Sequence, residues 1–78
     1  MFDTICEILL NYIEEPEGGL RPETTFIEDL AMSSLEIMTM VGDLEDKLGV
    51  SLELSEMRDL RSIGELAAYL TAEKAKNG

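Results

Sequence analysis

The sequence contains no histidine and no tryptophan, and it has a single cysteine, Cys6. Without histidine, acid–base catalysis and metal binding through an imidazole are both excluded. One cysteine cannot form a disulfide within the chain, which suits a reducing compartment. No apolar run approaches the length of a membrane span, and the first residues lack the basic start of a signal peptide. We therefore expect a soluble cytoplasmic protein with no membrane segment.

Basic residues are also scarce, since six lysines and arginines stand against 17 aspartates and glutamates and give a net charge of −11. This charge argues against nucleic acids and anionic membranes as partners, because contacts to phosphate require a surplus of basic side chains. It favours protein partners with basic docking patches, since complementary fields speed their encounter. We expect the protein itself to be a monomer.

The chain has the length of one small domain, and we expect residues 1–78 to form it. Hydrophobic residues make up 45% of the sequence, so a packed core can form. The sequence offers no nucleophile paired with a base, and the acids of 43–49 lack the spacing of a calcium-binding loop. We therefore predict no catalytic residues, no enzyme activity and no metal site.

Apolar residues recur at helical spacing from residue 3 to about residue 15, which predicts a first helix. Cys6 lies on the apolar face of this helix and is expected to be a small core residue. Pro16 and the following glycines end the helix and begin a long connection that reaches Met32. A connection of this length is expected to pack onto the core, and its candidate anchors are Leu20, Phe26, Ile27 and Leu30.

Ser33 and Glu36 have the Ser-x-x-Glu spacing of a capping box, in which each side chain accepts a hydrogen bond from the other residue's backbone N–H. A second helix is predicted from Ser34 to about Leu48, followed by Gly49 as the expected terminating glycine. Ser34 then occupies the first helical position. Unpaired N–H groups and the helix dipole favour an anionic group there, so this serine could carry a phosphate ester.

The second helix has a core face and an apolar outer ridge. With a rotation of about 100° per residue, its core face carries Ile37, Met40, Val41, Leu44 and Leu48. Leu35 and Met38 fall away from that face, among acidic residues, and exposed apolar residues rimmed by charge are typical of transient docking surfaces. The predicted docking residues are Leu35, Glu36, Met38, Asp43, Glu45 and Asp46. Alternatively, Leu35 and Met38 pack under the long first loop or a neighbouring helix.

After Gly49 the sequence predicts a connector and a short third helix. Residues 50–54 alternate apolar and polar side chains without a second strand to pair with, which indicates an extended connector anchored by Val50, Leu52 and Leu54. The short helix is predicted from Ser55, its cap, to about Leu60. Two of the six basic residues lie here, Arg58 and Arg61, and we expect them to offset the repulsion among nearby acids rather than to bind a ligand.

The last helix is predicted to begin at a second capping box, formed by Ser62 and Glu65. Its apolar face carries Ile63, Leu66, Ala67 and Leu70, and the tail from about residue 72 loses this face and is expected to fray. The predicted fold is all-α. It is a small four-helix bundle, with three longer helices, one short helix and a long first loop.

Residues 29–35, Asp-Leu-Ala-Met-Ser-Ser-Leu, resemble the Asp-Leu-Gly-x-Asp-Ser-Leu motif of acyl carrier proteins. Residues 44–50 and 62–70 are similar to further segments of that family, so the resemblance covers nearly the whole chain. Two positions depart from the motif, because Ser33 stands where the family has aspartate and Ala31 where it has glycine. Ser33 can still cap the helix, but it lacks the negative charge of the aspartate.

The resemblance implies that Ser34 carries 4′-phosphopantetheine, whose thiol holds acyl groups as thioesters. It also implies a carrier whose partners are a phosphopantetheinyl transferase and the acyl-transferring and chain-elongating enzymes of fatty-acid or specialised, polyketide-type biosynthesis. In this family the second helix is the docking helix. An acyl chain is expected to lie among Met38, Met40, Ile63 and Leu66. The alternative is a small acidic interaction module without a prosthetic group, in which Ser34 only neighbours the cap.

Overall fold

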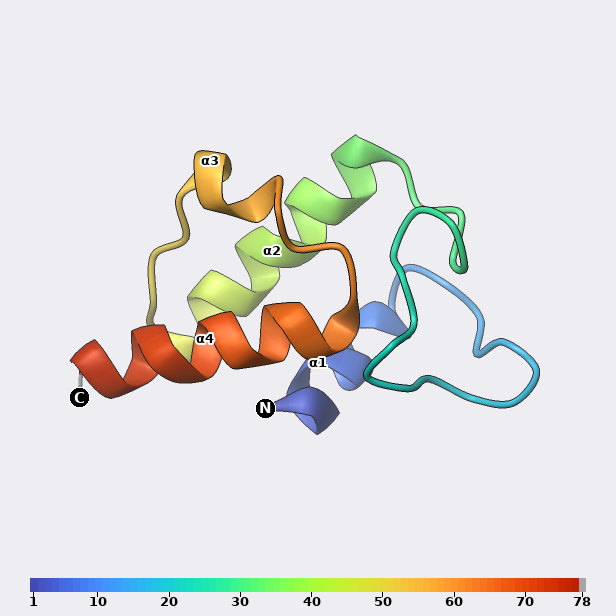
Figure 1. Ribbon diagram of the computed structural model, residues 1–78, viewed down its shortest axis with the longest axis horizontal. Coiled ribbons are helices and arrows are strands. Elements are labelled where there is room, and N and C mark those ends of the chain that lie inside the picture. The colour runs from blue at the N-terminus through green and yellow to red at the C-terminus, as the bar shows by residue number, and fades with distance from the viewer. Residues whose placement is uncertain (78) are drawn as a thin grey trace.

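The computed structural model describes residues 1–77, except for the side chains of Leu54 and Asn77, and within that range it contains four helices and no sheet. In chain order the helices are α1 (Phe2–Leu9), α2 (Ser34–Leu48), α3 (Leu54–Met57) and α4 (Ile63–Asn77) (Figure 1). The all-α fold with a long first loop is therefore confirmed. None of these helices is both long and apolar enough to cross a membrane, as far as the described residues extend.

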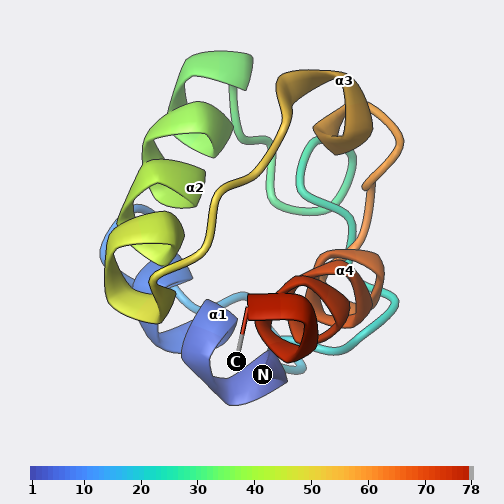
Figure 2. The ribbon, with the colours of Figure 1, turned by 90° about the vertical axis from the view of Figure 1, so that its left-hand side faces the viewer.

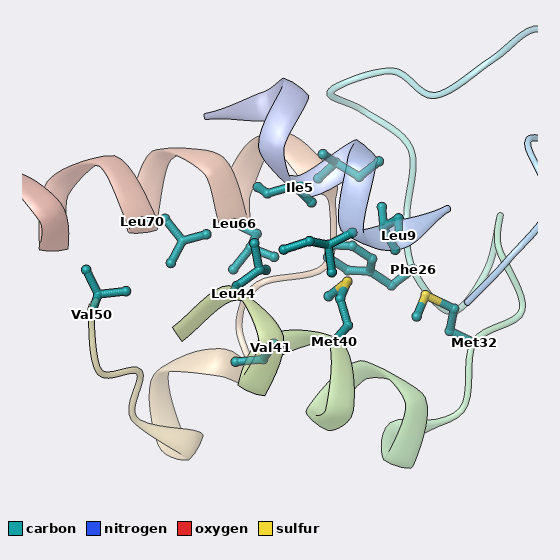
Figure 3. Packing of buried hydrophobic residues seen from close by; sticks show 12 residues of the cluster. Ile5, Leu9, Phe26, Met32, Met40, Val41, Leu44, Val50, Leu66 and Leu70 are labelled. Carbon is teal, nitrogen blue, oxygen red and sulfur yellow. The ribbon is translucent and has the colours of Figure 1, made fainter. Parts of the chain in front are cut away.

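One hydrophobic core lies between the three longer helices. Seen from one end, α1, α2 and α4 surround it, and α3 lies above α4 and across from α2 (Figure 2). The predicted inward face of α2 is confirmed, because Met40, Val41 and Leu44 are buried among side chains of the other helices (Figure 3). Removing apolar surface from water stabilises this arrangement. The buried apolar residues are Ile5, Ile8, Leu9, Phe26, Met32, Met40, Val41, Leu44, Val50, Ile63, Leu66 and Leu70.

The first helix is shorter than the sequence predicts, because the regular α-helix ends at Leu9 and not near residue 15. The amide of Asn11 donates to the carbonyl of Ile8 at 3.0 Å, and that of Tyr12 to Leu9 at 2.9 Å. These bonds span three residues where an α-helix spans four, so the chain tightens into 3₁₀-type turns. Apolar periodicity cannot distinguish such turns from a continuing helix.

Cys6 is half-buried and is not one of the buried residues that form the core, where the sequence placed it. Burial, together with the Asp3 and Glu15 carboxylates, raises the pKa of its thiol. A raised pKa keeps the sulfur protonated and unreactive, since the thiolate is the reactive form.

The long first loop packs onto the bundle through Phe26, whose side chain is only 2% exposed. Backbone hydrogen bonds hold this part of the loop against the start of α4: Phe26 N–H donates to the Arg61 carbonyl and Ile63 N–H to the Thr24 carbonyl, both at 3.0 Å. The prediction of Ile27 as an anchor was wrong, because this side chain is 62% exposed. Its neighbour Phe26 occupies the core, and the turn directs the next residue outward.

The connector after α2 is extended, and its first residue, Val50, is buried as predicted. The Leu52 amide donates to Glu45 Oε2 at 2.9 Å, which ties the connector to α2. The predicted anchor at Leu54 concerns a side chain outside those described. The predicted cap at Ser55 was wrong: α3 begins at Leu54, after Glu53, and no side chain caps it.

The third helix also ends earlier than predicted, at Met57 and not near Leu60. The chain continues in a tighter turn, because the Leu60 amide donates to the Met57 carbonyl at 3.1 Å. As after α1, the apolar residues keep a helical spacing in this turn although the regular α-helix has already ended.

The last helix begins at the predicted capping box: Ser62 N–H donates to Glu65 Oε1, and Glu65 N–H donates to Ser62 Oγ, both at 3.2 Å. The predicted fraying from about residue 72 was wrong, because α4 continues to Asn77. Alanine, glutamate and lysine have high helix propensity, and lysines near a helix C-terminus interact favourably with its dipole. The helix propensity and the dipole interaction stabilise α4 beyond the last residue of its apolar face.

We expect Gly64→Ala to destabilise the fold. A side-chain carbon at position 64 would lie 2.9 Å from the carbonyl oxygen of Pro22, which also accepts the Gly64 amide at 2.7 Å. The substitution should lower the free energy of unfolding by about 1–3 kcal/mol, the usual cost of overpacking. Urea unfolding followed by circular dichroism measures this change.

The matched control is Gly42→Ala within α2, where no described atom beyond the two neighbouring residues and the adjoining backbone of the helix lies within 4 Å of the added carbon. This variant should be about 0.5–1 kcal/mol more stable, since alanine is the better helix former. Equal stability of the two variants would contradict the close approach of the loop to α4.

Candidate functional site

The start of α2 is fixed by the predicted capping box. The Ser33 hydroxyl accepts from the Glu36 amide at 3.2 Å, and Glu36 Oε1 accepts from the Ser33 amide at 2.9 Å. Ser33 has an extended backbone, as an N-cap residue requires. At the other end of the helix, Gly49 adopts the left-handed conformation with φ +69°. Both ends of α2 are therefore set by local interactions.

The turn before α2 is held by Thr25 and Asp29. The Thr25 amide donates to Asp29 Oδ2 at 2.8 Å, and the Asp29 amide donates to Thr25 Oγ1 at 3.1 Å. Hydrogen bonds from the backbone and hydroxyl of Thr25 to the charged carboxylate lower the pKa of Asp29 below its usual value of 3.8. The stability from this bond is therefore present above pH 3.8 and is lost as pH falls through the lower pKa of the folded state.

Ala31 has a positive φ of +53°, in the left-handed region that side chains other than glycine rarely adopt. The conformation is held from both sides, because the Ala31 amide donates to Ile27 at 3.1 Å and the next amide, of Met32, to Phe26 at 3.0 Å. The Met32 side chain is also buried. A left-handed residue here explains why the motif that this segment resembles has glycine at this position.

Ser34 is exposed and is the first residue of α2. No partner is recorded among the described residues for the backbone N–H groups of Ser34 and Leu35, as expected in a first helical turn. These donors and the helix dipole favour negative charge at this point. Ser34 also lines a cavity with a volume of about 620 Å³.

Three segments form this cavity: the loop at 25–28, the first two turns of α2, and the segment 57–61 at the end of α3. In Figure 1 the three approach one another near the start of α2. The lining is mostly apolar, with two arginines and one glutamate. It consists of Thr25, Phe26, Ile27, Glu28, Ser34, Ile37, Met38, Met57, Arg58, Leu60 and Arg61.

Of the four side chains expected to surround an acyl chain, only Met38 lines the cavity. Met40, Ile63 and Leu66 are between 0 and 2% exposed within the core, so their contact with an acyl chain stays a prediction. These three lie in the interior between the long helices, whereas the cavity borders this core through Phe26 and Ile37. Sequence periodicity identified the apolar residues correctly but could not tell core from cavity.

The outer surface around Ser34 carries exposed apolar side chains. Leu35 is 75% exposed and Met38 is 49% exposed, so neither is packed away under the first loop. Ile27, at 62% exposure, adds a residue that the sequence placed in the core. Large apolar side chains exposed next to one another favour a contact surface.

The four predicted acidic docking residues differ in how they are engaged. Glu36 accepts from the Ser33 amide, Glu45 from the Leu52 amide, and Asp43 from the Tyr12 hydroxyl. The bond to Asp43 raises the pKa of Tyr12, because ionisation would remove the proton that the hydroxyl donates and would place two negative charges together. Among the described residues no hydrogen bond or ion pair is recorded for Asp46, which is exposed. Asp46 is therefore the acidic residue most available to pair with a basic side chain of a partner protein.

Comparison with known proteins supports one family. The family model described as the phosphopantetheine attachment site matches residues 3–70. An acyl carrier protein of an Exiguobacterium species is 42% identical over 66 residues, which are 85% of this chain and 84% of that protein. One from Clostridium perfringens is 29% identical over 76 residues, 97% of this chain and all of that protein.

The chain belongs to the acyl carrier protein family. The fold agrees, since the solved structure of a thermally stable acyl carrier protein from Enterococcus faecalis superposes with a TM-score of 0.78 at 18% identity. That match covers 92% of this chain and 91% of the other.

Membership of the acyl carrier family establishes the class of function. The protein carries acyl groups on a covalently attached 4′-phosphopantetheine and is a carrier and not an enzyme. It interacts with a phosphopantetheinyl transferase and with biosynthetic enzymes. The alternative of an interaction module without a prosthetic group does not agree with this family.

We expect Ser33→Ala to lower the free energy of unfolding by about 1 kcal/mol, because the substitution removes the hydroxyl that accepts the Glu36 amide. Ser33→Asp should retain the stability of the native chain within about 0.5 kcal/mol, since aspartate caps as well as serine. Thermal unfolding of the variants measures both changes.

Ser55→Ala is the control, because Ser55 is exposed and α3 has no side-chain cap. It should change stability by less than about 0.5 kcal/mol. A loss at Ser55 equal to that at Ser33 would contradict the assignment of the cap.

Proposed function

We propose that Ser34 is the residue that carries 4′-phosphopantetheine. The observation that carries this proposal is the position of its side chain, which is exposed at the first turn of a capped helix and lines the cavity. The residues present fit the group. The hydroxyl is open to a large substituent, and the free amides of the first turn can stabilise the negative charge of a phosphodiester.

The other four serines fit less well. The Ser33 hydroxyl is engaged in the capping box. Ser62 is buried and caps α4. Ser51 and Ser55 are exposed but do not line the cavity. Ser34 alone among the five combines an exposed hydroxyl, a helix N-terminus and an adjoining cavity.

When bound, the group supplies a flexible arm and a thiol that holds an acyl group as a thioester. The chain's own residues bind and orient: the first turn of α2 receives the phosphodiester charge, and the apolar side chains of the cavity can cover an acyl chain. No titratable side chain of this site needs to move a proton. The protein thus provides position and recognition, and its partners provide the chemistry.

We further propose that partner enzymes dock on the outer surface of α2 around Ser34. The exposed Leu35 and Met38 provide apolar contacts, and Asp46 provides an unengaged charge. Glu36, Asp43 and Glu45 add to the negative field of the same helix although hydrogen bonds within the chain engage them. Basic patches on acyl-transferring and chain-elongating enzymes would complement this field. Fatty-acid biosynthesis as the pathway, the monomeric state and a cytoplasmic location stay predictions.

Incubation with coenzyme A, Mg²⁺ and a broad-specificity phosphopantetheinyl transferase should add one phosphopantetheine to the native chain, measured by intact mass. Ser34→Ala should abolish the adduct completely, because it removes the only oxygen to which the group is proposed to attach. Ser55→Ala, another exposed serine, should be modified as the native chain is. A full adduct on Ser34→Ala would overturn the assignment.

We expect Asp46→Lys to lower kcat/KM for acyl transfer to partner enzymes about fivefold at low ionic strength, chiefly through slower association. The loss should shrink as salt screens the field. Glu45 is left unchanged in this design, because its carboxylate holds the Leu52 amide.

Glu23→Lys makes the same change of charge at an exposed position of the first loop. This control should keep kcat/KM within about twofold of the native value. Equal effects of the two substitutions at low salt would show that total charge matters and that α2 is no docking surface.

A further inference from the structure

The cavity beside Ser34 differs in charge from the rest of the molecule. The chain has a net charge of −11, with six basic residues in all. Two of these six, Arg58 and Arg61, line the cavity, and Glu28 is its single acid. The lining is therefore net positive in a strongly acidic protein.

The two arginines are not used in ion pairs within the described part of the chain. The ion pairs recorded there join Lys47 to Glu7 at 3.5 Å and Lys76 to Glu73 at 3.4 Å. Both arginines are exposed. A guanidinium group is a fork of donors that matches the two oxygens of a carboxylate or phosphate, so it is well suited to bind an anion at this position.

We propose that the cavity accepts acyl groups that end in a second carboxylate, and that Arg58 and Arg61 bind this carboxylate. The inference rests on the proposed attachment at Ser34. The apolar residues of the cavity would cover the methylene chain, and the guanidinium groups would pair with its charged end. Such an acyl group thus complements the lining, because its methylene chain meets apolar side chains and its carboxylate meets groups of opposite charge.

An acyl chain with a methyl end matches this lining less well. Its end would displace water from the arginines without replacing the lost hydrogen bonds, which is unfavourable for a charged group. A terminal carboxylate replaces them with charge-assisted bonds. The cavity therefore distinguishes two chains of equal length by what they carry at the far end.

The phosphodiester of the arm is the other anion near this cavity. It would be attached at Ser34, where the unpaired amides of the first turn already favour negative charge. The arginines belong to the segment that follows α3. Because the amides of the first turn already provide donors for the phosphodiester, we assign the arginines to the group that the arm carries and not to the arm itself.

The test loads the protein with adipoyl or hexanoyl groups, using the corresponding acyl coenzyme A and a phosphopantetheinyl transferase. The two groups have equal chain length and differ in the terminal carboxylate. Intact mass of the native chain and of Ser34→Ala first shows whether loading occurs at Ser34. The pKa of the adipoyl carboxyl is then measured by carbon NMR with a labelled terminal carbon.

The carboxyl pKa on the loaded native protein should be lower by about 1 than that of free adipoyl-pantetheine, because an adjacent cation favours the charged form. Arg58→Gln with Arg61→Gln should abolish this lowering. The control pair Arg21→Gln with Lys74→Gln removes two exposed charges outside the cavity and should leave the lowering in place. Melting temperatures should show the same pattern, with the adipoyl form stabilised over the hexanoyl form only where both arginines are present.

Each contrary result has a separate meaning. Loading on Ser34→Ala would overturn the proposed attachment and this inference with it. Loading at Ser34 with an unchanged carboxyl pKa would overturn the inference alone. This comparison of the pKa on the loaded native protein with that of free adipoyl-pantetheine uses no variant that could fail to fold. A phosphorus NMR shift that responds to the arginine pair when the arm carries no acyl group would also overturn it, since the arginines would then bind the phosphodiester.

Discussion

The reciprocal hydrogen bonds between Ser33 and Glu36 are the interaction on which the functional end of this molecule depends. They satisfy the backbone N–H groups of Ser33 and Glu36 and leave the two between them, of Ser34 and Leu35, without a partner among the described residues. Ser34 therefore begins a helix whose N-terminus is held in place by the capping box, while two amides at this positive end remain able to bind a ligand. An anion attached at this residue would meet a dipole and amide donors that are already in place.

The cavity depends on a second constraint, the attachment of the first loop to the start of α4. Backbone hydrogen bonds join Phe26 to Arg61, Thr24 to Ile63 and Pro22 to Gly64. Because these bonds hold the loop and the segment after α3 together, both can lie beside the first turns of α2. The side chains that surround the cavity thus come from parts of the chain distant in sequence.

Local patterns predicted the elements that local interactions control. Both capping boxes and both ends of α2 could be located from the sequence, because a cap joins residues three positions apart and a terminating glycine acts where it stands. The same holds for the core face of α2. The sequence failed where tertiary contacts decide: at the end of α1, at the exposed Ile27, and in identifying the side chains that line the cavity beside Ser34. Periodicity shows that a residue faces inward but not which neighbour it meets.

Amide hydrogen exchange at the start of α2 tests the central claim most directly. The amides of Ser33 and Glu36 are bonded in the capping box and should exchange slowly, whereas those of Ser34 and Leu35 should exchange at nearly the rate of an unstructured chain. This alternation would show a fixed helix start with open donors beside the Ser34 hydroxyl. Equally fast exchange at all four amides would contradict the account, because the platform that presents Ser34 would then not be held in place.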